Sequence, residues 1–544
     1  MSFKINLNNE TLTFEKKVRL IDLSKGDKQI IAAKVNNRVF ELDYEVYYDA
    51  DVEFLTLKDS IAIGHYRRSL LFVFLHAAHL VCPEIRFKLS YSVSRALFAR
   101  DVNGGYVTPD TVDKIEAKMH ELVQKDYPFE KIIVNNDEAE KIYKEYRLQD
   151  KIDILKYRPE KTVHFYVCNG YKNYLFGRMV PSTGYIQKFK LRSYNPGLLI
   201  TYPRSECKGE IPPFTEEPNF AKSLTESGRW AKKVGLDLVS GINSQIKTPE
   251  AQDIINICED KQYRMLVHLG DIIEQQIETT RLICVAGPSS SGKTTFANRL
   301  CDELRSRGFT PIRVSLDDYY LQREDVPIDE DGNPDFEHID ALDKKLFNEN
   351  MLDLLNGKEV TLPKFNFKKN IREAGRTLKI RSTDPIIVEG IHALNEEMTS
   401  LIPKNNKFKI FISPQVQLNL DYENPISLTD VRLLRRIVRD FKYRSASAEE
   451  TFSMWPSVRK GEFRWIYKTQ EDADYVFDSF LPYELCVLKR YALPLLKSVD
   501  KDSIYYPDTL RLVRMIKYFK DIDPKYIPCN SLICEFIGGS SYEV

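Results

Sequence analysis

Residues 287–295 read GPSSSGKTT, and this stretch decides the fold of the region around it. It matches G-x-x-x-x-G-K-[ST] without a mismatch, a pattern whose backbone N–H groups wrap around phosphate oxygens. The apolar run LICVA (282–286) precedes it and a helical pattern follows it, as phosphate binding requires. We therefore predict a phosphate-binding loop rather than an ordinary Gly/Ser turn. The predicted nucleotide-binding residues are Gly287, Pro288, Ser289, Ser290, Ser291, Gly292, Lys293, Thr294 and Thr295.

The motif also assigns roles to two side chains. Lys293 is expected to reach the β- and γ-phosphates, and the Thr294 hydroxyl is expected to bind Mg²⁺. A phosphate-binding loop alone does not separate a kinase from an ATPase or a GTPase, so the strands that follow must decide the chemistry.

Length and composition set the frame. A chain of 544 residues predicts three or four domains. Lys+Arg 79 balances Asp+Glu 79, so no global field favours nucleic acid or an anionic membrane. The apolar run at 69–81 is too short to span a membrane, and the first residues lack the layout of a signal peptide. The nine cysteines contain no CxxC pair and predict reduced thiols. We expect a cytoplasmic protein without membrane contact.

The pattern along the chain predicts a multidomain α/β protein. Short alternating runs with an Asn-Asn turn open the chain, and an α+β pattern and a mostly helical stretch follow. Strands then alternate with helices, which predicts a parallel sheet with its ligand at the carboxyl ends of the strands. The predicted regions are 1–60 (β-rich), 61–215 (α+β), 216–278 (a helical connector), 279–505 (the P-loop region) and 506–544 (a tail).

Two strand ends deliver carboxylates to the edge that carries the loop. The run PIRVSL leads into Asp317, which we expect to orient an acceptor hydroxyl and take its proton. The alternative is that Asp317 only caps the next segment. The run PIIVEG ends in Glu389, a candidate Mg²⁺ ligand; a buried salt bridge or a helix cap is the alternative.

The run VRLLRRIVRDFKYR places arginines on one face of a helix. They stand at i, i+3, i+4 and i+7, with aliphatic residues on the other side. A basic face is most often solvated, but beside a phosphate-binding loop guanidinium groups can stabilise charge on a moving phosphoryl group. These residues are Arg432, Arg435, Arg436 and Arg439.

Together these residues resemble the uridine kinase and phosphoribulokinase family over roughly 280–500. The similar segments are VAGPSSSGKTT, SLDDYY, PDFEHIDALD, LPKFNFKKNIR, VEGIHAL and RRIVRD, in the order of the family. The resemblance implies an ATP- and Mg²⁺-dependent kinase with Asp317, Lys293, Arg436 and Arg439 as catalytic residues. It also implies an acceptor site at Tyr320, Glu337, Phe365, Phe367, Asn370 and Arg444.

Two acceptor positions depart from the family. Glu337 stands where the family has an aspartate that resembles a ribose-hydroxyl ligand, and Asn370 stands where uridine kinases tend to have a histidine. A site built to hydrogen-bond its substrate discriminates strongly against mismatched partners. The departures therefore affect the predicted identity of the nucleoside more than the prediction of phosphoryl transfer.

The segment MWPSVRKGEFRW has no obvious counterpart in stand-alone uridine kinases. Its Arg459, Lys460 and Arg464 could close over the phosphates or form a solvated loop. We leave these alternatives open here.

The first half resembles parts of threonyl-tRNA synthetases. Residues 30–57 resemble the TGS module, a β-grasp unit, and the run PSTGYIQKFKLRSYNPGLLITYP resembles the editing domain that follows it. The editing family has a helical HxxxH pair, but His65 is followed by Ser69 here. His76 and His79 are expected to belong to the core, with Cys168 outside a metal site. The domain is expected to bind or scaffold rather than hydrolyse. The order of a TGS-like module, an editing-like domain and a uridine kinase-like domain resembles the fused architecture of bacterial nucleoside kinases.

The function predicted overall is ATP-dependent phosphorylation of a hydroxyl group, most simply the 5′-hydroxyl of a uridine- or cytidine-like nucleoside. The alternatives are a kinase of another small molecule, or an RNA- or translation-linked protein that uses the P-loop region as a nucleotide-dependent switch. The N-terminal domains would sense RNA or a nucleotide, or form a structural or dimerising platform. We expect a homo-oligomer, with a weak indication of RNA contact.

Overall fold

The computed structural model describes residues 2–8, 10–330, 332–366, 369, 371–381 and 383–543. Phe367 and Asn370 of the predicted acceptor site lie outside the described residues. In the part of the chain that is described, no helix is both long and apolar enough to cross a membrane.

A mixed five-stranded sheet opens the chain, with the order β2-β1-β7-β4-β5. Its central pair, β1 and β7, is parallel, and the other pairs are antiparallel. The predicted Asn-Asn turn joins β4 to β5, and Asn36 and Asn37 both have positive φ, as a two-residue hairpin turn requires. The β-rich pattern of this region is therefore present, and its resemblance to a TGS module stays a prediction. The elements are β1 (Phe3–Leu7), β2 (Glu10–Phe14), β3 (Val18–Arg19), α1 (Leu20–Leu23), β4 (Ala32–Val35), β5 (Arg38–Phe40), β6 (Glu45–Val46) and β7 (Ala50–Leu55).

Two further antiparallel sheets and a long helix follow, with the strand orders β13-β14-β9-β8 and β10-β11-β12. One hydrophobic cluster runs from Phe3 to Tyr202, so the first sheet and the long helix α2 share a core. The resemblance of this region to an editing domain stays a prediction. Its elements are α2 (Ser60–Val81), β8 (Phe87–Val93), β9 (Ala96–Asp101), α3 (Pro109–Gln124), β10 (Glu130–Asn135), α4 (Asn136–Glu145), α5 (Gln149–Leu155), β11 (Thr162–Cys168), β12 (Tyr171–Asn173), β13 (Lys190–Tyr194) and β14 (Gly197–Thr201).

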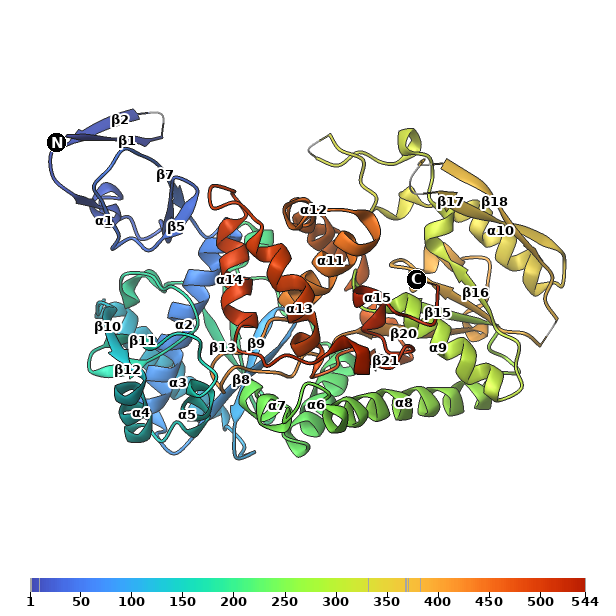
Figure 1. Cartoon of the computed structure of the whole chain (residues 1–544), viewed down its shortest axis with the longest axis horizontal. Coiled ribbons are helices and arrows are strands. Elements are labelled where there is room, and N and C mark those ends of the chain that lie inside the picture. The colour runs from blue at the N-terminus through green and yellow to red at the C-terminus, as the bar shows by residue number, and fades with distance from the viewer. Residues whose placement is uncertain are drawn as a thin grey trace.

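Three helices lead to the second half: α6 (Pro218–Lys233), α7 (Val239–Gln245) and α8 (Gln252–Gln275). In Figure 1, α8 runs along the edge of the molecule towards the sheet of the second half.

A five-stranded sheet, in which every pair is parallel, carries the P-loop in the order β16-β19-β15-β20-β21. All five residues of β15 are buried, because this strand is covered on both faces. Leu282, Cys284 and Ala286 pack into one cluster, while Ile283 and Val285 pack into another. The predicted parallel sheet is confirmed. Its elements and the hairpin arm beside it are β15 (Leu282–Ala286), α9 (Lys293–Ser306), β16 (Ile312–Ser315), α10 (Lys344–Leu355), β17 (Val360–Asn366), β18 (Ile371–Leu378), β19 (Ile386–Glu389), β20 (Lys407–Ser413) and β21 (Tyr475–Asp478).

The remaining helices lie between the two halves in Figure 1. Residues 506–544 include α14 and α15, and their apolar side chains join the core cluster of α11 and α13. The C-terminal segment therefore packs against the P-loop region. These helices are α11 (Leu428–Arg444), α12 (Ala448–Gly461), α13 (Glu484–Lys497), α14 (Tyr506–Ile516) and α15 (Cys534–Ile537), and a π-helical turn, Glu462–Ile466, continues α12.

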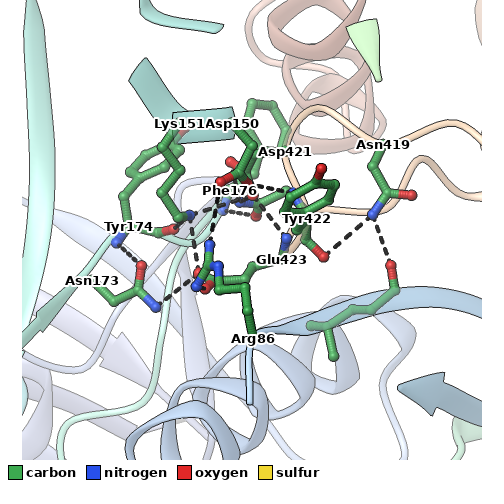
Figure 2. A network of polar contacts seen from close by, with 12 residues as sticks. Arg86, Asp150, Lys151, Asn173, Tyr174, Phe176, Asn419, Asp421, Tyr422 and Glu423 are labelled. Atoms are coloured by element: carbon green, nitrogen blue, oxygen red, sulfur yellow. Dashed lines mark hydrogen bonds and ion pairs between the residues drawn. The ribbon is translucent and has the colours of Figure 1, made fainter. Parts of the chain in front are cut away.

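A buried polar network joins the halves through residues 419–424, just before α11 (Figure 2). The Lys151 ammonium lies 3.0 Å from Glu423 and 3.3 Å from Asp421. Arg86 also pairs with Glu423, and the Tyr422 N–H donates to Asp150 at 2.7 Å. Burial alone would raise the pKa of Glu423, but Arg86 and Lys151 lower it to about 2. Removing one partner of such a network leaves a buried charge uncompensated, so the network fixes how the halves meet.

Candidate active site

The P-loop connects β15 to α9, and its glycines meet steric demands. A Cβ at Gly287 would lie 2.0 Å from the Ile412 carbonyl oxygen, so no larger residue fits there. Gly292 has a φ of +91°, a region that favours glycine. The loop ends at the first turn of α9, where unpaired backbone N–H groups favour anions.

Polar groups gather inside this loop. The Ser290, Ser291 and Thr295 hydroxyls are buried and have no hydrogen-bond partner among the described residues. The Lys293 Nζ donates to the carbonyl oxygens of Gly287 and Pro288 at 3.0 and 3.2 Å. Desolvation lowers the pKa of Lys293, while the carboxylates of Glu389 and Asp317 oppose this. A bound phosphate chain would accept hydrogen bonds from these unpaired hydroxyl groups and would neutralise the desolvated Lys293 ammonium.

Asp317 and Glu389 both lie close enough to Lys293 for their charges to raise its pKa, against desolvation. Asp317 lies in a 3₁₀ turn after β16 (Leu316–Tyr319), and Glu389 is the last residue of β19. Asp317 is accessible to solvent, but the protein around it desolvates it and raises its pKa, against Lys293. Glu389 is buried, and burial, followed by the Asp317 charge, raises its pKa to about 7. The side-chain ion pair of Glu389 with Arg313 is loose, at 3.9 Å.

This donor set fits Mg²⁺. The Asp317 charge raises the pKa of Glu389, so a cation beside them would stabilise the ionised carboxylates, and Mg²⁺ prefers oxygen ligands from one or two carboxylates and phosphates. Among the described residues, no group of three or more His, Cys, Asp or Glu side chains could hold a metal by itself. Phosphate oxygens and the Thr294 hydroxyl would therefore complete the coordination.

Three arginines of α11 share one carboxylate. The buried Asp440 pairs with Arg436 at 3.0 Å, with Arg439 at 3.5 Å and with Arg444 at 3.2 Å. The Arg436 guanidinium also donates to the Ser289 hydroxyl at 2.9 Å. The Arg444 side chain is 56% exposed, and the Arg439 charge chiefly lowers its pKa to about 10, so it stays protonated at neutral pH. Three cations against one anion leave positive charge beside the P-loop.

The other two arginines of this face are not solvated. Arg432 and Arg435 are 0% and 1% exposed. Arg432 pairs with Glu462 and donates to the Ser289 carbonyl at 2.8 Å. Arg435 pairs with Glu484 and donates to the Ser290 carbonyl at 3.2 Å. The solvated-face alternative is wrong for these two residues, because the P-loop and two buried carboxylates cover them.

Tyr320, a predicted acceptor residue, lies close to Asp317. Tyr320 contacts Phe336 and the buried Phe365 edge to face, with ring centroids 5.9 Å apart in both cases. Its hydroxyl donates to the Phe336 carbonyl at 3.2 Å. Glu337 is half-buried; burial and the nearby Glu462 raise its pKa to about 7, against Arg436. Tyr320 therefore lies near both Phe365 and Glu337, and the role of these residues in acceptor binding stays a prediction.

The segment with Arg459, Lys460 and Arg464 is helical and not a loop. It consists of the end of α12 and the π turn, and a capping box at Ser447 and Glu450 starts this helix. All three cations pair with carboxylates: Arg459 with Glu462, Lys460 with Glu330 and Arg464 with Asp335. The segment is therefore not a loop, although the Lys460 and Arg464 side chains are about half exposed to solvent, and closure over the phosphates stays a hypothesis.

Several residues that matter to the geometry were missed by sequence reasoning. Asp440 follows the arginine run directly, and a carboxylate within one turn of three arginines was a usable signal. Glu462 and Glu535 carried no such signal, because they meet the site only through folding. The Glu535 carboxylate accepts the Thr295 N–H at 3.1 Å, at the start of α9.

In the N-terminal half, His65 and His76 are buried within α2, whereas His79 is exposed. The His76 ring stacks on Tyr171 at 4.8 Å, and Cys168 is a buried free thiol. The core assignment therefore holds for His76 and is wrong for His79, because this residue lies at the solvated end of α2.

Residues 282–484 match the phosphoribulokinase / uridine kinase family. A uridine kinase from Staphylococcus aureus is 30% identical over 201 residues, which cover 37% of this chain and 88% of that protein. A uridine kinase from Halobacterium salinarum is 29% identical over 195 residues, which cover 36% of this chain and 78% of that protein.

Solved structures give weaker similarity. A possible uridine kinase from Bacillus stearothermophilus has a TM-score of 0.24 and 20% identity, covering 39% of this chain and all of that chain. D-Glycerate 3-kinase from Cryptococcus neoformans has a TM-score of 0.22 and 13% identity, covering 46% of this chain and 87% of that chain. Scores this low support no argument about function.

Proposed function

Because the chain belongs to the phosphoribulokinase / uridine kinase family through residues 282–484, we propose that it transfers the γ-phosphoryl group of ATP to a nucleoside. The acceptor would be the 5′-hydroxyl of a uridine- or cytidine-like substrate. One observation carries the proposal: the Asp317 carboxylate is close enough to act electrostatically on both Lys293 of the P-loop and Tyr320 of the aromatic and carboxylate site. A nucleotide-dependent switch has no use for a base and an acceptor site at this position.

The residues would divide the work as follows. The P-loop amides and Lys293 hold the phosphates of ATP, while Thr294 and Glu389 would hold Mg²⁺, which supplies charge neutralisation when bound. Asp317 orients the acceptor hydroxyl and takes its proton as the oxygen bonds to the γ-phosphorus. The bond from that phosphorus to the leaving ADP breaks, and Arg436 and Arg439 stabilise the charge that moves with the phosphoryl group.

The acceptor side would select the substrate. Tyr320 and Phe365 offer aromatic surface for a base, and Glu337 offers a carboxyl group for ribose hydroxyls. With a pKa of about 7, Glu337 can donate as well as accept a hydrogen bond near neutral pH.

A nucleoside panel with ATP, read as ADP and nucleoside monophosphate formed, tests the proposal. Asp317→Asn should lower kcat by about 10²- to 10⁴-fold, because a positioned base contributes that much, while ATP still binds. The exposed Asp325 provides the control: Asp325→Asn should keep the wild-type rate. Unchanged turnover in Asp317→Asn removes the assigned base. No response to any nucleoside, with RNA-stimulated ATP hydrolysis instead, would favour the switch.

A further inference from the structure

Helix α12 and its π turn touch the acceptor site at one glycine. A Cβ at Gly461 would lie 2.4 Å from the Cβ and 2.9 Å from the Cγ of Glu337. Real Cβ contacts are longer, so the helix backbone lies directly against this side chain. The π turn begins at the next residue, and such turns in otherwise α-helical segments occur frequently at functional sites.

The inner side of the π turn is anchored to the P-loop. Glu462 is 0% exposed and pairs with both Arg432 and Arg459. The Arg432 guanidinium donates in turn to the Ser289 carbonyl at 2.8 Å. The same turn thus contacts the phosphate side through Glu462 and the acceptor side through Gly461.

The outer side of the turn faces residues 332–340 of the acceptor loop. Trp465 lies edge to face with His338, with ring centroids 4.7 Å apart. Arg464 lies 3.9 Å from Asp335, but its side chain is 50% exposed, so solvent screens this pair. Steric contact at Gly461 and Trp465 therefore holds the loop more than the surface charges do.

The N-terminal half reaches the same turn through Arg95. The Arg95 guanidinium lies 4.3 Å from the ring centroid of Phe463, and that of Arg459 lies 4.7 Å from it. Arg95 belongs to the tight turn between β8 and β9, where it and Ser94 have positive φ. A further bond fixes its side chain, because it donates to the Cys207 thiol at 3.1 Å.

We propose that residues 448–467, the acceptor wall, position Glu337 for the acceptor, and that Arg95 of the N-terminal half holds this wall in place. Glu337 touches the acceptor, whereas Gly461, Phe463 and Arg95 are positioning residues. The inference rests on the proposed function for its kinetic part only. It gives the N-terminal half a role in acceptor binding that requires no ligand of its own.

Gly461→Ala tests the contact between the acceptor wall and Glu337. Alanine suits a helix better than glycine does, so any loss reports the contact with Glu337. We expect the acceptor KM to rise about tenfold with ATP KM unchanged. Gly64→Ala is the matched control, because Gly64 is also helical and an added Cβ there meets only the end of the Arg68 side chain, at 3.3 Å.

Arg95→Ala tests the contact between the N-terminal half and the acceptor wall. Loss of a cation–π contact should raise the acceptor KM about two- to twentyfold, again without a change in ATP KM. Arg192→Ala is the control, because Arg192 makes the same kind of contact, 4.4 Å from the Phe214 ring, within the N-terminal half. An equal rise in both KM values, or an equal effect of Arg192→Ala, would overturn the proposal.

Amide hydrogen exchange separates this inference from the proposed function, since it needs no substrate. In the full-length chain, Gly461→Ala and Arg95→Ala should speed exchange in residues 332–340, and the two controls should not. If no nucleoside is phosphorylated but exchange changes as expected, the proposed function is wrong and the proposed contact of the acceptor wall with residues 332–340 is supported. Wild-type exchange in both variants overturns the wall, whatever the kinetics show.

Discussion

The arginines of α11 fall into two groups with different surroundings. Arg432 and Arg435 are buried, and each pairs with a buried carboxylate, Glu462 or Glu484. Arg436, Arg439 and Arg444 all pair with one carboxylate, Asp440. In the first group each arginine is neutralised by its own carboxylate and donates to P-loop carbonyls. In the second group three cations pair with one carboxylate, so net positive charge remains to bind an anion. On this one helix, the paired carboxylates therefore separate the arginines that brace the P-loop from those proposed to contact phosphate.

The largest effect should come from breaking a compensated pair. Arg435→Met leaves Glu484 buried without its cation, and we expect a loss of about 3–5 kcal/mol in the free energy of unfolding. Thermal or urea unfolding measures it. Adding Glu484→Gln should recover most of the loss, because the uncompensated charge is gone. A small loss in Arg435→Met would place Arg435 with the second group.

Removing an arginine of the second group should affect the rate instead. Arg439→Ala should lower kcat by about 10²- to 10³-fold, the usual effect of losing a donor to developing charge, with little change in stability. Steady-state kinetics and thermal unfolding of the same samples check both parts. Arg490→Ala, which removes an exposed cation of α13, should change neither. A stability loss without a rate loss would make Arg439 a scaffold residue.

Glu337 extends the comparison to a carboxyl whose nearby cations, Arg436 and Lys293, do not offset its desolvation. Its pKa of about 7 lies above the usual 4.5, so the folded state keeps a proton that the unfolded state releases between these pH values. Its contribution to stability therefore falls as pH rises from about 4.5 to 7, by up to roughly 3 kcal/mol. Glu337→Gln should flatten the unfolding profile over this range. An unchanged profile would mean that Glu337 ionises normally.

The smallest effect concerns an anion placed against the P-loop helix. Glu535 accepts the Thr295 N–H, a group that the phosphates of ATP can also use. Glu535→Gln should lower stability by about 0.3–1 kcal/mol, because an anion at a helix N-terminus is worth that much. It should also lower ATP KM slightly, since one negative charge near the phosphates is lost. A weaker affinity for ATP would show that Glu535 supports the nucleotide site.

Motif reasoning located the P-loop, the parallel sheet and the edge that brings Asp317 and Glu389 together. These features follow from local backbone demands and from the rule that parallel strands end at one edge. It did not find the contact between Gly461 and Glu337, and it left the segment from Trp455 to Arg464 open. A charged run such as VRKGEFR is typical of an exposed segment. It does not identify its ion-pair partners, because most of them are distant in sequence.

The sequence by itself determined the phosphate-binding loop and the helical face of α11, since both depend on residues within a few positions of one another. Only the tertiary structure decided which arginines are compensated. The partners Glu462 and Glu484 lie 30 and 49 residues beyond Arg432 and Arg435. Periodicity places four arginines on one face, but burial and the carboxylates that folding brings there decide which of them remain available to phosphate.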